Sequence, residues 1–239
     1  MAKKLLNQNA KFVDFLVNTV EPDFNFVSKP INRFKSKENK VNLSKQNKLE
    51  QLINLKKKIN SIENCNLKEH AKNTITGDGN INSPLMLIGE TPGELEDSLG
   101  STFQGEVGEL LKKMLLAINI KIEDVYSAYS ISYRPPEDRK PTSLEIKRYS
   151  IFLKEHISII DPKIIILMGG TAMEALTGHK NKISEERGKW KEIILGNKTY
   201  PFIITFNPSY LLRFPENKKY SWDDLKKIKQ KIQDLNIKI

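Results

Sequence analysis

The chain has 239 residues and a formal net charge of +10, with 39 Lys and Arg against 29 Asp and Glu. This length fits one domain of about 150–200 residues plus an extension. The basic charge indicates either a polyanionic partner such as nucleic acid or a compositional bias toward Lys and Asn. One cysteine, Cys65, excludes an intrachain disulfide. Without a bilayer-length apolar run or a signal-peptide core, we expect a cytoplasmic monomer with no membrane partner.

The first part of the chain differs in character from the rest. Residues 12–20 predict a short amphipathic helix, and residues 29–45 are polar and basic. We therefore expect residues 1–45 to form an N-terminal extension, a short helix followed by a flexible basic linker. The linker is either an arm that contacts phosphates or an ordinary disordered tail. Residues 46–239 are expected to form the main domain.

Helical and strand patterns alternate through this main domain. Helices are predicted over residues 46–60, 106–118, 142–160, 171–177 and 221–233, and strands over 85–88, 125–131, 163–168 and 200–206. Thr142 and Glu145 have the spacing of a capping box, Gly178 closes its helix, and Ser221 is predicted as an N-cap. Strands separated by helices predict an α/β fold, a three-layer α/β/α sandwich with a central mostly parallel sheet.

The most informative segment is the turn that follows the strand at 85–88. Four apolar residues run into Gly89-Glu90-Thr91-Pro92-Gly93. Because ligands of open α/β sheets bind beyond the carboxyl ends of the strands, Glu90 is expected at a site of chemistry. The alternative is a turn carboxylate that accepts hydrogen bonds from backbone amides. Glu96 and Asp97 are read as caps of the next segment rather than as catalysts.

Two other strand ends lead into polar loops. The strand at 125–131 leads to Arg134, and the strand at 200–206 leads to the loop 207–213. In a parallel sheet these loops emerge on one edge together with Glu90 and Phe103. We therefore expect the three loops to surround one pocket.

An ordered set of motifs carries a family resemblance. The set comprises Gly89–Gly93 with Glu96-Asp97, Phe103-Gln104-Gly105, Arg134-Pro135-Pro136, Arg139-Lys140-Pro141, Arg187-Gly188-Lys189-Trp190 and Pro208-Ser209-Tyr210-Leu211-Leu212-Arg213. Over roughly residues 60–235 the chain resembles the uracil-DNA glycosylase superfamily, and most closely its family 4 type. The resemblance implies hydrolysis of the bond between uracil and deoxyribose after the base has left the stack.

The resemblance also implies roles for individual residues. Glu90, Thr91 and Asn207 would be catalytic, with the attacking water held at Glu90 and Thr91. The base would contact Gly89, Pro92, Gly93, Phe103 and Tyr129, with Phe103 stacking on the uracil. DNA would contact Arg134, Ser209, Leu211, Leu212 and Arg213, with Leu211 or Leu212 as an apolar wedge and Arg213 near phosphate.

Three departures from the family pattern stand out. Asn207 occupies the place of a histidine that would stabilise charge on a uracil carbonyl, and Tyr129 occupies the place of an asparagine that would read the base edge. Tyr129 is either a residue of the base pocket or a strand-end residue that packs the core. The four cysteines of the family's [4Fe–4S] cluster correspond to Ile62, Cys65, Tyr133 and Tyr149. We therefore predict no cofactor and no metal, with Tyr133 and Tyr149 filling the volume of the cluster.

The sequence thus predicts a monofunctional DNA N-glycosylase for base excision repair that acts on DNA containing uracil or a related deaminated base. Two alternatives stay open. One is a catalytically weakened DNA-binding protein of the same fold, and the other is a glycosylase with altered lesion specificity.

Overall fold

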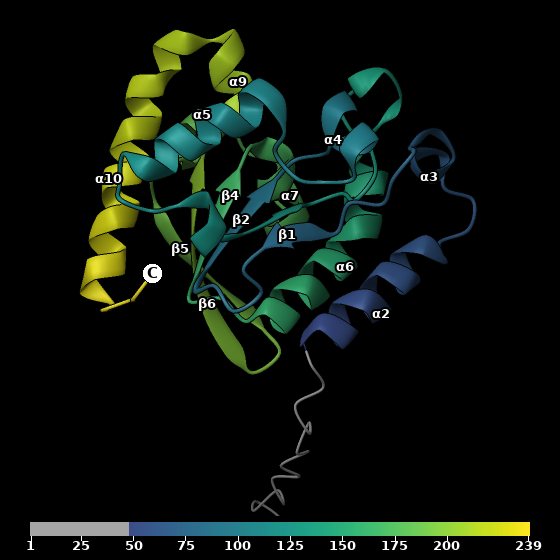
Figure 1. Ribbon diagram of the computed structural model, residues 1–239, viewed down its shortest axis with the longest axis horizontal. Helices are drawn as coiled ribbons and strands as arrows, with labels where there is room; N and C mark the ends of the chain where they lie inside the picture. The colour runs from purple at the N-terminus through teal and green to yellow at the C-terminus, as the bar shows by residue number, and fades with distance from the viewer. Residues whose placement is uncertain (1–47) are drawn as a thin grey trace, which may run out of the picture. The chain divides into compact units, whose positions relative to one another are not determined.

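The computed structural model describes residues 48–239, so the predicted extension over residues 1–45 lies outside the described residues (Figure 1). The helices are α2 (Lys48–Asn60), α3 (Asn66–His70), α4 (Glu94–Leu99), α5 (Gly105–Leu116), α6 (Ser143–Ile160), α7 (Gly170–Thr177), α8 (Ile183–Glu186), α9 (Pro208–Arg213) and α10 (Lys218–Asp234), with short 3-10 turns at Ile122–Asp124, Pro136–Asp138 and Pro215–Asn217. The strands are β1 (Gly77–Gly79), β2 (Leu85–Gly89), β3 (Tyr126–Tyr129), β4 (Ile164–Met168), β5 (Trp190–Leu195) and β6 (Lys198–Thr205).

The strands form one six-stranded sheet in the order β1-β3-β2-β4-β6-β5. The inner strands β3, β2, β4 and β6 pair in parallel, and the edge strands β1 and β5 pair antiparallel to their neighbours. The carboxyl ends of the four parallel strands therefore share one edge of the sheet. The turns after β2, β3, β4 and β6 all leave from this edge.

Helices cover both faces of the sheet. Alternate residues of β2 point to opposite sides, so that Met86 and Ile88 belong to one apolar cluster and Leu85 and Leu87 to the other. The first cluster is completed by residues of α2, α6 and α7, and the second by residues of α5 and α10. Every residue of β2 and β4 is buried, as parallel strands between two helical layers require. The predicted three-layer α/β/α sandwich is confirmed (Figure 1).

Of the predicted helix caps, the capping box of α6 is confirmed and the N-cap of α10 is wrong. The capping box of α6 is present, because the Thr142 hydroxyl accepts from the Glu145 amide and the Glu145 side chain accepts from the Thr142 amide. The prediction of Ser221 as an N-cap is wrong, since α10 begins earlier, at Lys218, and Ser221 is a buried residue inside it. The sequence reading also missed β5, which forms a hairpin with β6. Within residues 48–239, no helix is long and apolar enough to cross a membrane.

Candidate active site

A cavity of about 480 Å³ opens at the carboxyl edge of the sheet. It collects side chains from the turns after β2, β4 and β6, from the loop between α4 and α5, and from the segment before α6. Its lining consists of Glu90, Thr91, Pro92, Gly93, Glu96, Phe103, Val107, Tyr129, Asp138, Arg139, Lys140, Pro141, Thr171, Asn207, Ser209 and Arg213. The carboxylate, the aromatic ring and the amide that the sequence singled out therefore share one cavity.

Glu90 is the central carboxylate of this cavity. Its Oε1 accepts a hydrogen bond of 2.9 Å from the backbone amide of Thr171, in the first turn of α7. Its Oε2 accepts one of 3.3 Å from Nδ2 of Asn207. The amino end of a helix favours a negative group, so α7 provides a matched position for the carboxylate. Glu90 is thus held by two elements that are far apart in the sequence, and it still lines the open cavity.

Gly169 makes room for this carboxylate. Its φ is +109°, and a Cβ placed there would lie 2.3 Å from Cδ of Glu90 and 2.5 Å from Cγ. Both observations require glycine, because L-residues rarely adopt this φ and the space is already occupied. The β4–α7 turn therefore lets the Glu90 side chain lie directly against the backbone.

Asn207 stands between β6 and α9, and it is 6 % exposed. Its Oδ1 accepts from the amide and the hydroxyl of Ser209, at 3.0 and 3.1 Å, which makes it the N-cap of α9. Its Nδ2 is directed at Glu90 and at the backbone carbonyl of Met168. One amide side chain therefore fixes both the start of α9 and the orientation of the carboxylate.

Phe103 and Tyr129 form the aromatic wall. Their ring centroids lie 4.9 Å apart, and the Tyr129 hydroxyl accepts a hydrogen bond of 3.0 Å from the Phe103 amide. This bond supports Phe103 in a left-handed conformation with φ of +47°. Burial first, and then the charge of Glu96, raise the pKa of Tyr129. A Cβ on Gly89 would come within 2.8 Å of both rings, so this glycine provides clearance for the wall.

Glu96 and Asp97 are occupied by structural hydrogen bonds. Glu96 accepts from the amides of Gly93 and Gln104, at 3.1 and 2.9 Å, which are the residues directly before α4 and α5. Asp97 accepts from the amides of Lys72 and Asn73. The interpretation as a cap fits Glu96, which also lines the cavity, whereas Asp97 holds the segment that follows α3 instead of capping its own helix.

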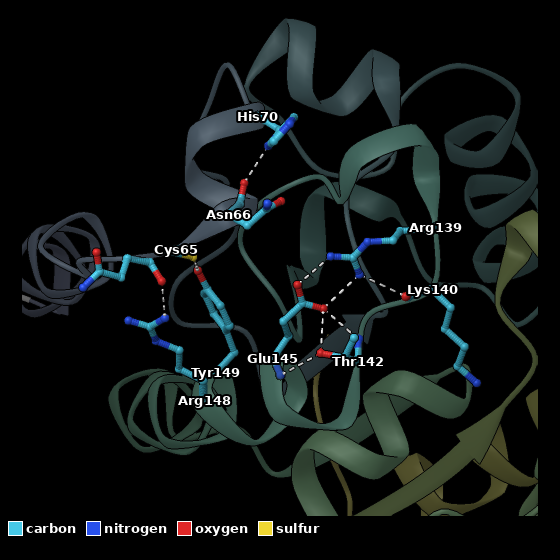
Figure 2. Close-up of polar contacts among 10 residues, drawn as sticks. Cys65, Asn66, His70, Arg139, Lys140, Thr142, Glu145, Arg148 and Tyr149 are labelled. Carbon is cyan, nitrogen blue, oxygen red and sulfur yellow. Dashed lines mark hydrogen bonds and ion pairs between the residues drawn. The ribbon is translucent and has the colours of Figure 1, made fainter.

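The rim of the cavity carries two cations without side-chain partners among residues 48–239, Lys140 and Arg213, and both side chains line the cavity. The neighbouring Arg139 is instead paired with Glu145 at 2.7 Å, and this hydrogen bond is the largest cause that lowers the Glu145 pKa to about 2. Figure 2 shows the Lys140 side chain pointing away from that pair. Lys140 and Arg213 are therefore the cations available to an anionic ligand.

Two of the predicted DNA contacts, Leu211 and Arg134, need correction. Leu211 is 1 % exposed, so it packs inside the protein and cannot act as a wedge, whereas Leu212 next to it is half-buried. Arg134 does not line the cavity, because its guanidinium is paired with Asp138 at 2.7 Å and lies 3.8 Å from Glu94. Among the predicted DNA contacts, Leu212 is the accessible leucine and Arg213 the accessible cation.

The positions that correspond to the family's cluster cysteines lie together below α3 and beside α6. Cys65 Sγ is 3.3 Å from the Tyr149 hydroxyl (Figure 2). The rings of Tyr133 and Tyr149 meet edge to face, with their centroids 6.2 Å apart. Ile62 packs against the same apolar cluster. A [4Fe–4S] cluster is held by four thiolates, and here one thiol faces two phenol rings and an alkyl chain. The residues present therefore do not fit such a cluster, and we assign no step to one.

Sequence reasoning missed two groups that complete the site. The Thr171 amide and Gly169 belong to the β4–α7 turn, and they hold and accommodate Glu90. The consecutive Gly169 and Gly170 after a buried strand were the available signal, since such a pair marks a place where backbone and side chain come close. Lys140 belongs to the motif Arg139-Lys140-Pro141, but the sequence analysis assigned it no role.

The fold and the cavity define a class of α/β/α proteins that hold a carboxylate, an aromatic wall and an amide at the carboxyl edge of a parallel sheet. A family model described as the uracil DNA glycosylase superfamily matches residues 76–229. The chain is 37 % identical over 172 residues to a type-4 uracil-DNA glycosylase of Thermotoga maritima, covering 71 % of this chain and 88 % of the relative. Proteins of the same name from Archaeoglobus fulgidus and Saccharolobus solfataricus are 30 % and 32 % identical, covering 75 % and 72 % of this chain and 92 % and 82 % of the relatives. The chain belongs to the uracil DNA glycosylase superfamily.

Proposed function

We propose that the protein is a monofunctional uracil-DNA glycosylase that removes uracil, or a related deaminated base, from DNA by hydrolysis and leaves an abasic site. The observation that carries the proposal is the cavity in which Glu90, Phe103 and Asn207 meet. The family membership supplies the reaction type. We further propose that the protein acts as a monomer in the cytoplasm on uracil-containing DNA.

Glu90 and Thr91 are the groups that handle the attacking water. Breaking the glycosidic bond leaves positive charge on the sugar, and a carboxylate opposes that charge. The two amides that hold Glu90 leave it facing the cavity in a fixed orientation. The Thr91 hydroxyl has no hydrogen-bond partner among residues 48–239, and it lines the same cavity, so it is available to orient water.

The base is held by stacking and by one neutral amide. The ring of Phe103 presents an apolar face to an extruded pyrimidine. Asn207 Nδ2 is a side-chain donor beside the carboxylate, and it can donate to a uracil carbonyl as the base leaves. Because an amide carries no positive charge, this donor is weaker than a protonated histidine would be. Pro92 and Gly93 complete the wall beside Glu90.

The DNA backbone meets the rim of the cavity. Lys140 and Arg213 stand on two different segments of the lining, so they can contact phosphates on either side of the extruded nucleotide. Leu212, between Leu211 and Arg213 on α9, is placed to fill the gap left in the base stack. Ser209 is placed beside them in the first turn of α9.

The test is release of free uracil from single-stranded DNA and from duplexes with U·G and U·A pairs, measured with the purified full chain. We expect release by the wild type and a loss of about 100- to 1000-fold in Glu90→Gln, which removes the charge but keeps the shape. Undamaged DNA of the same sequence is the control substrate. Intact folded protein that releases no base from any lesion-bearing substrate would overturn the proposal.

Two observations favour a second candidate, a DNA-binding protein of the same fold with weakened catalysis. Asn207 is neutral, and the Tyr129 hydroxyl is already bonded to the Phe103 amide instead of facing a base edge. This candidate predicts salt-dependent DNA binding without excision. Restoration of excision in the double variant Asn207→His with Tyr129→Asn would support it, whereas wild-type excision would exclude it. Excision confined to hypoxanthine or xanthine would instead indicate an altered lesion specificity.

A further inference from the structure

A series of stacked aromatic rings leads from the active-site turn to the surface. The rings of Phe206 and Tyr210 lie 5.0 Å apart with 23° between their planes, and those of Tyr210 and Phe214 lie 4.8 Å apart with 37° between them. Phe206 precedes Asn207, and Phe214 follows Arg213. The series therefore runs along α9, directly beside the cavity.

The inner end of the series is anchored by a buried ion pair. The Arg187 guanidinium lies 5.7 Å from the Phe206 centroid and 5.3 Å from the Tyr220 centroid. It is bonded to Asp224 at 3.0 and 2.7 Å, and Asp224 is fully buried and also accepts from the Thr205 hydroxyl at 2.8 Å. Since these contacts already fix the rings, little ordering is left to be done when a ligand stacks on them.

The outer end of the series is open and basic. Phe214 is 44 % exposed and Tyr220 is 41 % exposed. Arg213 directly precedes Phe214 in the sequence. The Lys219 ammonium lies 4.9 Å from the centroid of the Tyr220 ring. Arg213 is the last residue of α9, and Lys219 and Tyr220 lie in the first turn of α10. Phe214 begins the turn from α9 into α10, which is at the top of Figure 1. Glu216 lies in the same turn, where it accepts a hydrogen bond from Asn217, so cations outnumber the single carboxylate.

We propose that Phe214 is a stacking platform for an unpaired nucleotide that flanks the extruded base, and that the protein therefore binds single-stranded DNA more tightly than duplex. Exposed rings interleaved with cations are the combination that binds single strands, because every base offers a face for stacking and every linkage a phosphate. In a duplex the flanking bases stay paired and stacked, so the ring has no partner. The inference rests on the proposed function for the placement of DNA at the cavity.

The experiment measures binding of undamaged DNA, as a short single strand and as the matching blunt duplex, by fluorescence anisotropy across a range of salt concentrations. Phe214→Leu keeps the apolar bulk and removes the aromatic face. We expect it to weaken single-strand binding about 5- to 150-fold, the range for one base stacked on a ring, and to leave duplex binding unchanged. The slope of log affinity against log salt should stay the same, because no cation is lost.

Trp222→Leu is the matched control. The exposed fraction of Trp222, 43 %, is similar to that of Phe214, but its ring contacts no other aromatic ring in the described part of the chain. We expect Trp222→Leu to bind both forms of DNA as the wild type does, whereas Arg213→Gln should lower the salt slope by about one for both forms. Circular dichroism and thermal unfolding of each variant verify that it is folded.

Two results would overturn the inference. One is unchanged single-strand binding in Phe214→Leu, and the other is an equal loss on single strands and duplexes. The proposed function fails separately, if the wild type releases no base from any substrate in the excision assay. Excision without a Phe214 effect would refute only the platform, and a Phe214 effect without excision would refute only the enzyme.

Discussion

Gly169→Ala tests whether the position of Glu90 determines the reaction rate. The added Cβ would lie 2.3 Å from Cδ of Glu90, where ordinary van der Waals contact begins at 3.4 Å. The carboxylate would have to withdraw by about 1 Å, a displacement large enough to cost about 100-fold in rate when it moves a reacting group. The same displacement would break the hydrogen bond of 2.9 Å from the Thr171 amide.

The substitution also strains the backbone. A φ of +109° is almost closed to alanine, and a residue held in such a region loses on the order of 1–3 kcal/mol. We therefore expect two separable effects, a lower free energy of unfolding and a single-turnover rate that falls about 100-fold in the protein that remains folded. Affinity for undamaged DNA should stay the same, because Gly169 does not line the cavity.

Gly170→Ala is the control for this prediction. Gly170 is the next residue and the first of α7, and a Cβ there would meet nothing within 4 Å. Single-turnover excision of uracil, measured at a temperature where both variants are folded, should be normal in Gly170→Ala and strongly reduced in Gly169→Ala. Equal rates in the two variants would refute the reasoning that the Glu90 carboxylate must lie against this backbone.

Two further predictions concern buried polar groups. Tyr129→Phe leaves the Phe103 amide without its acceptor, so urea unfolding should show a loss of about 1–3 kcal/mol, and unchanged stability would show that the bond contributes nothing. Burial lowers the pKa of His156 from 6.5 to about 4. Between pH 6.5 and 4 the unfolded chain therefore binds a proton at His156 that the folded chain does not bind. The contribution of neutral His156 to the free energy of unfolding should be fully present above pH 6.5 and fall by about 3 kcal/mol as the pH approaches 4. A His156→Gln variant that loses just as much stability over this range would contradict that origin.

The layered fold could be predicted because buried parallel strands leave a strong signal. Runs such as 85–88 and 164–168 are apolar on both faces, and only a sheet covered on both sides buries them. The edge strand β5 left a weaker signal, since its residues Trp190–Leu195 mix charged and apolar side chains and only pairing with β6 makes them a strand. Ser221 was wrongly predicted as an N-cap because a polar residue at the start of a helical pattern resembles one. The helix in fact begins at Lys218, directly after the 3-10 turn at Pro215–Asn217.

The candidate site could be predicted as far as strand order determines it. Glu90 and Asn207 follow the ends of β2 and β6, so a parallel sheet alone brings them to one edge, whereas Phe103 reaches the cavity from the loop between α4 and α5. Contacts between segments that are distant in the sequence could not be predicted from it. Neither the amide of Thr171 on Glu90 nor the choice between Leu211 and Leu212 can be read from a linear pattern, because both depend on how a helix is rotated against its neighbours.

The most direct test of the central claim is a crystal structure of the protein with DNA that carries a non-hydrolysable 2′-fluoro analogue of deoxyuridine. The account predicts the uracil ring in van der Waals contact with the Phe103 ring, at about 3.5–4.0 Å, with the sugar carbon of the glycosidic bond facing the Glu90 carboxylate. A uracil that is seated elsewhere, or that stays paired in the duplex with the cavity unused, would contradict it.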